Sequence, residues 1–195
     1  TGIEYDACLR DEGLESDRPS DLNCFWMATD PGVSDGSVFR RLKQRNGVFK
    51  RCYTLQLYYM GYGGNHNTTT RFRRYRGEGN QVARDAELPD SLRPAILAEY
   101  TDAAHLNRPN RWRHIRLEAD GMRIRYYIDG ECLVDYRDPQ PSTEGWFGLR
   151  TTWSRLRMTN FTCHTEPLSE QPQSGITLRW IERPQQTDSL AVRFG

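Results

Sequence analysis

The stretch RWRHIRLEADGMRIRYYIDGECLVDY, residues 111–136, contains the pattern that decides the fold. Apolar residues alternate with polar ones in two rows: Trp112, Ile115 and Leu117, with a bulge after Trp112, and then Ile124, Tyr126 and Ile128. This period of two is typical of strands that bury one face. Asp-Gly pairs at 120–121 and 129–130 end the first two runs, and such pairs favour the positive φ angles of a tight hairpin turn. The stretch therefore predicts three successive antiparallel strands.

Similar alternating runs occur on both sides of this stretch. The expected strands are residues 2–10, 21–29, 52–62, 68–76, 111–119, 122–128, 131–136, 145–151 and 156–164. Only one short segment, beginning at Pro89, favours a helix, and Pro94 limits its length. Many short strands separated by turns predict an all-β fold, built as a two-sheet antiparallel sandwich.

Composition limits the class of protein. The chain has 195 residues, enough for one domain with a sizeable core. Its mean hydropathy is −0.82, and no apolar run approaches the roughly 18 residues of a membrane span, so we expect a soluble domain without a membrane partner. The five cysteines are scattered singly without zinc spacing, which favours free, buried thiols. No motif predicts a metal site or a cofactor.

Charge is distributed unevenly along the chain, although the net charge is only +1. Residues 36–80 carry ten basic side chains and a single acid, Glu78, whereas residues 1–35 are acidic. Basic residues interleaved with aromatic ones can hold a nucleic-acid backbone. The acidic segment, expected beside them in the sheet, argues against a continuous basic face, so we do not predict a nucleic-acid partner.

The order of motifs resembles a known fold. Trp112, the Asp-Gly turns, I-x-Y-x-I-D-G at 124–130, G-x-F-G-L at 145–149 and Asn160-Phe161 are similar to the concanavalin-A-like lectin/glucanase jelly roll, of the LamG-like kind. The resemblance covers residues 1–164 and implies a jelly-roll sandwich. It implies no single activity, because lectins, hydrolases and lyases share this fold. A jelly roll normally has strands before the first one seen here, so we expect the N-terminal strands to be missing.

Two further segments narrow the resemblance. SDLNCFWMATDP at 20–31 and LAEYTD at 97–102 look like a group of uncharacterised bacterial sandwich domains linked to polysaccharide utilisation. This implies a poly- or oligosaccharide partner and a secreted or periplasmic location, although no signal peptide is visible.

The end of the chain has a different pattern. Residues 166–175 are rich in Pro, Gln and Ser and predict a linker after a sandwich domain at 1–165. Residues 176–195 are predicted to begin a further β domain, and they are similar to the start of exo-acting rhamnogalacturonan lyases. The similarity implies a fusion to a downstream lyase domain and a pectin-like, acidic substrate.

Candidate site residues follow from the faces of the expected strands. Leu55 and Leu57 are expected in the core, which places Gln56, Tyr58 and Tyr62 on the opposite face, toward a saccharide cleft. Phe72 is likewise expected inside, and the same alternation places Arg71, Arg73 and Tyr75 outside. On the strand at 21–29, we expect Asn23 in the cleft and Trp26 in the core.

These residue types fit the chemistry of an acidic sugar. Arginine forks bind uronate carboxylates, and aromatic rings stack on sugar faces. We predict substrate binding by Asn23, Gln56, Arg71, Arg73, Tyr75 and Glu99. His66 follows two glycines in the loop GGNHN and is a candidate general base, with Tyr58 and Tyr62 as candidate catalytic partners. The alternative is a well-solvated hairpin with an aromatic ladder.

Three functions remain open at this point. A polysaccharide lyase uses an Arg or amide to neutralise the uronate and a His or Tyr to move protons. A glycoside hydrolase needs paired carboxylates, and the E-x-D-x-E motif typical of glucanases with this fold is absent. We therefore favour a lyase over a hydrolase, with a non-catalytic carbohydrate-binding module as the alternative.

Overall fold

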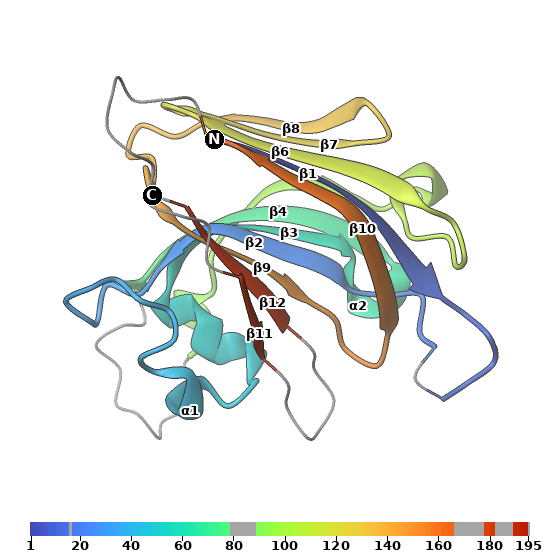
Figure 1. Cartoon of the computed structure of the whole chain (residues 1–195), viewed down its shortest axis with the longest axis horizontal. Coiled ribbons are helices and arrows are strands. Elements are labelled where there is room, and N and C mark those ends of the chain that lie inside the picture. Colours follow the sequence, from blue (N-terminus) through green and yellow to red (C-terminus); the bar gives the residue numbers. More distant parts are fainter. Residues whose placement is uncertain (16, 79–88, 166–177, 182–188, 195) are drawn as a thin grey trace.

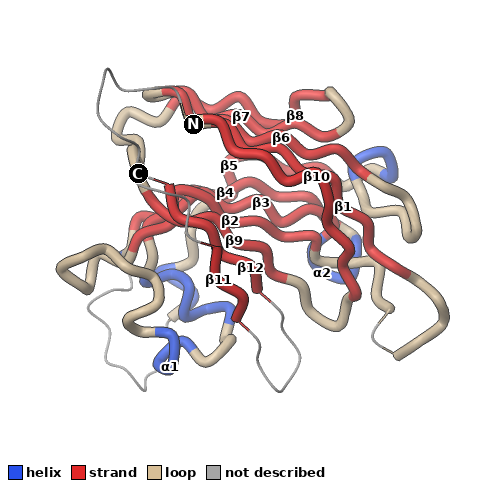
Figure 2. Tube along the Cα trace, in the orientation of Figure 1, coloured by secondary structure: helices blue, strands red, loops and turns tan. Residues whose placement is uncertain are grey.

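The computed structural model describes residues 1–15, 17–78, 89–165, 178–181 and 189–194. Two antiparallel sheets stack as layers, which Figures 1 and 2 show edge-on. The first sheet has the order β10 (Arg155–His164), β1 (Gly2–Arg10), β6 (Arg113–Asp120), β7 (Arg123–Ile128) and β8 (Glu131–Arg137). The second has the order β11 (Leu178–Ile181), β12 (Ser189–Phe194), β9 (Gly145–Arg150), β2 (Leu22–Thr29), β3 (Gln56–Gly63), β4 (Thr69–Arg76) and β5 (Ile96–Tyr100).

Helical segments in the described residues are short. They are α1 (Leu42–Arg45), α2 (Gly64–Asn67) and the 3₁₀ turns η1 (Phe49–Thr54), η3 (Asp90–Leu92) and η4 (Ala103–His105). In chain order, successive described strands change sheet after β1, β5, β8, β9 and β10. The predicted all-β, two-sheet antiparallel jelly-roll sandwich is therefore confirmed.

The main core lies between the two sheets and centres on Trp26. Its ring packs against Tyr58 and Phe72 from the same sheet and against Tyr126 from the opposite sheet. Met27 has a φ of 52°, and the pairing of β2 shifts register there, so Trp26 and Met27 both enter the core. Burial of such large side chains contributes roughly 1.5–3 kcal/mol each, which makes this cluster a main source of stability.

A second, smaller core covers part of the outer face of the seven-stranded sheet. Leu57, Tyr59 and Tyr75 from β3 and β4 pack there with Tyr53 of η1. The segment before β3, including α1 and η1, lies beneath this sheet in Figure 1. Both faces of β3 are therefore buried along most of its length.

The strand boundaries differ from the prediction at three places. Residues 52–54 belong to the turn η1 rather than to a strand, and β3 begins only at Gln56. The edge strand β5 was not predicted, because its sequence, ILAEY, does not alternate between apolar and polar residues. Trp112 precedes β6 and is exposed, so the prediction that it lies in a buried row is wrong; Arg113 is buried instead.

The C-terminal strands pair with the sandwich. β12 is antiparallel to β9, with Phe194 opposite Gly145, and β11 pairs with β12. The predicted linker at 166–175 lies outside the described residues. The division of the chain into a sandwich at 1–165 and a further domain from 176 stays a prediction. None of the described helices has the length and apolar character needed to cross a membrane.

Candidate functional site

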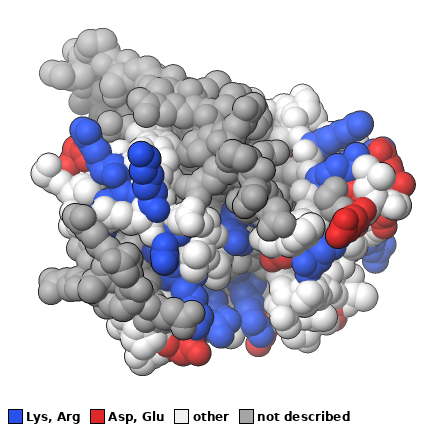
Figure 3. Space-filling view, turned by 90° about the horizontal axis from the view of Figure 1, so that it is seen from below, with Lys and Arg blue, Asp and Glu red and all other residues white. Residues whose placement is uncertain are grey.

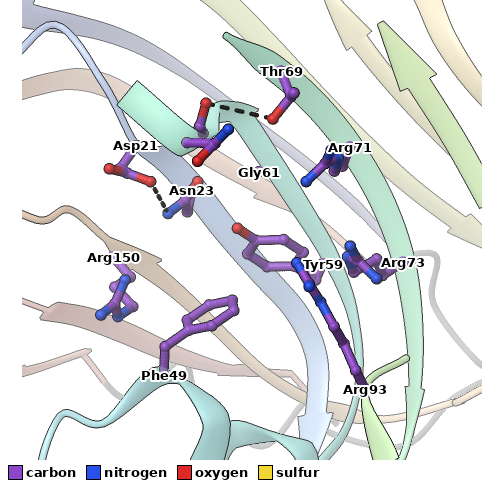
Figure 4. Close-up of a pocket in the computed structure, with 12 residues that line it drawn as sticks. Asp21, Asn23, Phe49, Tyr59, Gly61, Thr69, Arg71, Arg73, Arg93 and Arg150 are labelled. Atoms are coloured by element: carbon purple, nitrogen blue, oxygen red, sulfur yellow. Dashed lines mark hydrogen bonds between the residues drawn. The ribbon is translucent and has the colours of Figure 1, made fainter. Parts of the chain in front are cut away.

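A cavity of about 250 Å³ opens on the outer face of the seven-stranded sheet. Its lining is rich in arginine and comes from β2, β3, β4, β9 and the loops beside them (Figure 4). The lining residues are Asp21, Asn23, Phe49, Tyr59, Gly61, Gly64, Asn65, Thr69, Arg71, Arg73, Arg93 and Arg150.

Strand register explains why these residues meet. Arg150, Asn23, Gly61, Arg71 and Glu99 lie directly opposite one another on successive strands, β9, β2, β3, β4 and β5. We call these five residues the cross-strand row. Since residues opposite each other share a face, their side chains emerge together on the outer side. In this row Arg150 and Arg71 lie on either side of Asn23 and Gly61. Because the two central side chains are shorter than the arginines, the surface is concave there.

Gly61 forms the floor at the centre of the row. Tyr59, two residues earlier on the same face, folds its ring over Gly61. A Cβ at position 61 would overlap the Tyr59 hydroxyl and lie 2.8 Å from its Cζ. Phe25 and Phe49 hold the Tyr59 ring from two sides. Glycine is therefore needed here because another side chain already occupies the space.

Four arginines surround the cavity, and neighbours fix the positions of three. Arg71 Nε donates to Glu99 Oε1 at 2.5 Å, and Arg150 donates to Thr152 while its guanidinium lies over the Phe49 ring. Arg73 is buried and donates to the Pro94 carbonyl. Arg93 is exposed, its charge helps to lower the pKa of Asp90, and its side chain extends toward Tyr59 in Figure 4.

The arginines are close enough to repel one another. Burial is the main cause that lowers the pKa of Arg73 below its ordinary value, and the charges of Arg93 and Arg71 lower it further. Figure 3 shows this side of the molecule, where Lys and Arg side chains lie in several separate patches. The cavity therefore has an excess of positive charge that an anion would relieve.

Hydrogen-bond acceptors occupy the β2 end of the cavity. Asp21 accepts from Ser20 Oγ at 2.7 Å and from Asn23 Nδ2 at 3.3 Å. Asn23 is 1% exposed, and its Oδ1 has no hydrogen-bond partner in the described part of the chain. Burial raises the pKa of Tyr59, and the nearby charge of Asp21 adds to the rise. Tyr59 is therefore neutral at physiological pH.

The structure brings together some of the predicted site residues. Asn23, Arg71 and Arg73 line the cavity, and Glu99 borders it as the partner of Arg71. Their roles in substrate binding stay predictions.

Three predicted residues lie on the wrong face. Tyr58 and Tyr62 are fully buried in the core between the sheets, and Gln56 donates to the Arg76 carbonyl away from the cavity. The prediction that they face the cleft is wrong because Leu57 belongs to the second core on the outer face. Tyr58 donates to Asp138, so its contacts are those of a core residue.

Tyr75 and His66 also lie outside the cavity lining. Tyr75 is on the predicted face but is fully covered by the second core, where it packs against Tyr53. His66 lies in α2 with a φ of 59°, and its Nδ1 is 2.6 Å from Arg18 Nη2. Its neighbour Asn65 lines the cavity instead.

Several lining residues were not predicted for the site. Tyr59, Gly61, Arg93 and Arg150 come from three strands or loops that the sequence does not visibly connect. The register of the cross-strand row would have found Gly61 and Arg150, but it does not include Tyr59 or Arg93. In the described residues, no group of three or more His, Cys, Asp or Glu is arranged to hold a metal ion.

Comparisons with known proteins place the chain in a family. The solved structures that are similar to it include two from Bacillus species. The carbohydrate binding module CBM66 from Bacillus subtilis has 17% identity and a TM-score of 0.43, covering 82% of this chain and 71% of its own. A β-glucanase from Bacillus licheniformis has 12% identity and a TM-score of 0.40, covering 98% of this chain and 64% of its own. Both are too remote for an inference about ligand or activity.

No curated protein is significantly similar to the chain. Residues 1–161 match a family described as a domain of unknown function, DUF6250. Because this match spans most of the sequence, the chain belongs to the DUF6250 family.

Proposed function

We propose that the cavity binds an acidic sugar unit of a polysaccharide. The observation that carries the proposal is the imbalance of charge in the lining, where four arginines meet one carboxylate, that of Asp21, and Glu99 at the border pairs with only one of the four, Arg71. Planar guanidinium forks match the geometry of a carboxylate, and a bound anion would offset the repulsion among Arg71, Arg73 and Arg93.

A sugar fits the rest of the lining better than a simple anion does. Phe49 and Tyr59 offer aromatic surface, while Asn23, Asn65 and Thr69 offer polar groups. A sugar ring presents both apolar C–H faces and hydroxyl groups, so it uses both kinds of contact. A uronate adds the carboxylate that the arginines require.

The geometry favours binding over catalysis. A retaining or inverting hydrolase needs two carboxylates at the scissile bond, and the lining contains one. The tyrosines predicted as lyase groups lie in the core, and His66 is not part of the lining. Tyr59 does reach the cavity, but its raised pKa keeps the hydroxyl protonated, so it is not available as a general base. We therefore favour a carbohydrate-binding module over the lyase that the sequence favoured.

Two finer proposals follow from the resemblance in the sequence. The polysaccharide is of a plant type, pectin-like or rhamnogalacturonan-like, and the protein acts outside the cytoplasm, where such polymers occur. The similarity of residues 176–195 to rhamnogalacturonan lyases supports both proposals and the fusion to a downstream lyase domain.

The proposal is tested by binding to uronic polymers. Polygalacturonate should retard the chain in affinity electrophoresis, and a fully methyl-esterified sample should not, because esterification removes the charge. Arg71→Ala should weaken binding about tenfold or more, since a hydrogen bond to a charged group contributes roughly 1.5–3 kcal/mol. Arg123→Ala is the matched control, because Arg123 forms a similar surface pair with Asp135 at 2.5 Å on the other sheet.

Two results would contradict the proposal. If Arg71→Ala and Arg123→Ala bind polygalacturonate as the unmodified chain does, the cavity is not the binding site. If the chain produces unsaturated uronates from the polymer, seen by their ultraviolet absorbance, it is a lyase rather than a binding module.

A further inference from the structure

Asn23 is a polar residue of the cavity whose amide oxygen has no hydrogen-bond partner among the described residues. Its side chain is buried in the floor, yet Oδ1 accepts no hydrogen bond from any described residue. Buried acceptors are nearly always paired, and an unpaired one lowers stability. An unpaired buried group of this kind requires an explanation, and a partner that arrives with the ligand supplies one.

The neighbours of Asn23 indicate what that partner is. Asn23 Nδ2 already donates to Asp21 Oδ1 at 3.3 Å, which leaves the amide oxygen and the Asp21 carboxylate as adjacent acceptors. None of the ion pairs among the described residues involves Asp21. Two neighbouring acceptors call for two neighbouring donors, and a pair of hydroxyl groups on adjacent ring carbons supplies them.

The size of the cavity limits the ligand to one ring. Its volume of about 250 Å³ is below the roughly 300–1,000 Å³ of pockets for drug-sized ligands. Asn23 on β2 and Arg71 on β4 are separated by β3, which places their backbones about 10 Å apart. A single sugar ring between them can reach the acceptors at one end and the arginines at the other.

We propose that Asn23 and Asp21 form a hydroxyl-recognising end of the cavity, so that the site selects a single sugar unit carrying a carboxylate at one end and two adjacent hydroxyl groups at the other. This inference rests on the proposed binding of an acidic sugar. It adds that charge alone is not sufficient and that Asn23 determines specificity.

The test compares three small probes by ligand-observed NMR titration. Galacturonate carries the carboxylate and the hydroxyl groups, cyclohexanecarboxylate carries only the carboxylate, and galactose carries only the hydroxyl groups. The unmodified chain should bind galacturonate at least about tenfold more tightly than either of the others. Asn23→Leu should lose about tenfold in galacturonate affinity, equivalent to about 1.4 kcal/mol, and leave cyclohexanecarboxylate binding unchanged. Asn23→Ala, which adds no bulk to the floor, should show the same loss.

Thermal unfolding separates a binding role from a structural one. Because Asn23 Oδ1 is unpaired without ligand and Nδ2 forms only a long hydrogen bond of 3.3 Å to Asp21, Asn23→Leu should melt at the same temperature as the unmodified chain or higher. Asn107→Leu is the matched control, since buried Asn107 donates to the Tyr62 carbonyl at 3.0 Å and its loss should lower the melting temperature.

Four other outcomes would overturn the inference, and each of them contradicts a different part of it. If Asn23→Leu and Asn23→Ala bind galacturonate normally while Arg71→Ala does not, binding of an acidic sugar stands and the role of Asn23 is refuted. Equal affinity for galacturonate and cyclohexanecarboxylate refutes hydroxyl recognition. A melting temperature lowered as far as in Asn107→Leu makes Asn23 structural. If galacturonate does not bind to the unmodified chain, this inference and the proposed function both fail.

Discussion

Individual polar residues of this sandwich differ in whether the protein itself satisfies them. The Asp138 carboxylate is fully buried and accepts from Tyr58, Arg74 and Arg76, so its charge is compensated within the fold. Arg74 also lies over the Tyr58 ring, 4.5 Å from its centroid. Asn23 Oδ1, by contrast, is buried and accepts no hydrogen bond from a described residue. Asp138 and its partners connect the two sheets, whereas the Asn23 amide oxygen is available to a ligand.

Replacement of Tyr58 tests the structural side of this distinction. Tyr58→Phe removes a hydroxyl that donates to Asp138 at 2.8 Å and accepts from the Ser142 amide at 3.2 Å. We expect a loss of about 1–3 kcal/mol in the free energy of unfolding, because both partners lose a buried hydrogen bond. Denaturant unfolding measures this loss. Binding of polygalacturonate should be unaffected, and a selective loss of binding or turnover at full stability would restore Tyr58 as a site residue.

At the scale of the elements, the shape of the cavity depends on the register of four strands. β9, β2, β3 and β4 each contribute one cavity-lining residue to the cross-strand row. The residue from β3 is Gly61, which has no side chain. The Tyr59 ring over Gly61 is 7% exposed and is packed against Phe25, Phe49 and Tyr75. The ring therefore cannot move aside without disturbing the second core.

Gly61→Ala tests how strictly β3 must leave room for the Tyr59 ring. The new methyl group would overlap the Tyr59 ring, displace it into the cavity and lower both stability and affinity for an acidic sugar. We expect a loss of about 1–3 kcal/mol in unfolding free energy and a clear loss in galacturonate affinity. Gly2→Ala is the control, since a Cβ at that strand position meets no atom closer than 3.9 Å. Equal behaviour of the two variants would show that Tyr59 is not fixed over Gly61.

At the scale of the whole molecule, polar contacts connect the two sheets at their edges. His105, in the turn η4 after β5, lies 2.7 Å from Asp102 through Nδ1 and 3.2 Å from Glu131 of β8 through Nε2. Tyr100 of β5 contacts the same ring and donates to the Leu133 carbonyl of β8. The hydrogen bond to Asp102, followed by that to Glu131, raises the pKa of His105 above its usual value of 6.5.

This raised pKa predicts a pH dependence of stability with a defined sign. The protonated form of His105 is favoured in the folded state, so its contribution is complete below a pH of about 6.5 and is lost as the pH rises through the folded pKa. His105→Gln should therefore lower stability more at about pH 5.5 than at about pH 8.5. Urea unfolding of both proteins at the two pH values measures the difference, and a loss that does not change with pH would contradict the prediction.

Much of the architecture was predictable from local pattern, because it depends on short-range rules. Ile124, Tyr126 and Ile128 alternate with polar residues between Asp-Gly turns, and the structure has a strand and a hairpin there. The face of β3 was not predictable, because it is buried on both sides and hydrophobicity cannot distinguish them. Because the prediction assigned Leu57 to the main core, it placed Tyr58 and Tyr62 in the cleft. The same error placed Tyr59 in the core, so Tyr59 was not considered as a site residue.

The sequence by itself determined the all-β class, the antiparallel hairpins and the wealth of arginine near β4, since alternation, turn residues and composition are local properties of the chain. Only the tertiary structure decided which of these side chains form a site. Arg150 and Arg71 are distant in sequence but flank Asn23 and Gly61 in the cross-strand row, and Arg93 reaches the same cavity from a loop. The physical reason is that the register across several strands results from packing between segments that are distant in sequence. The second core, which covers part of the outer face, results from the same kind of packing. No local pattern in one segment indicates which other segment it will contact.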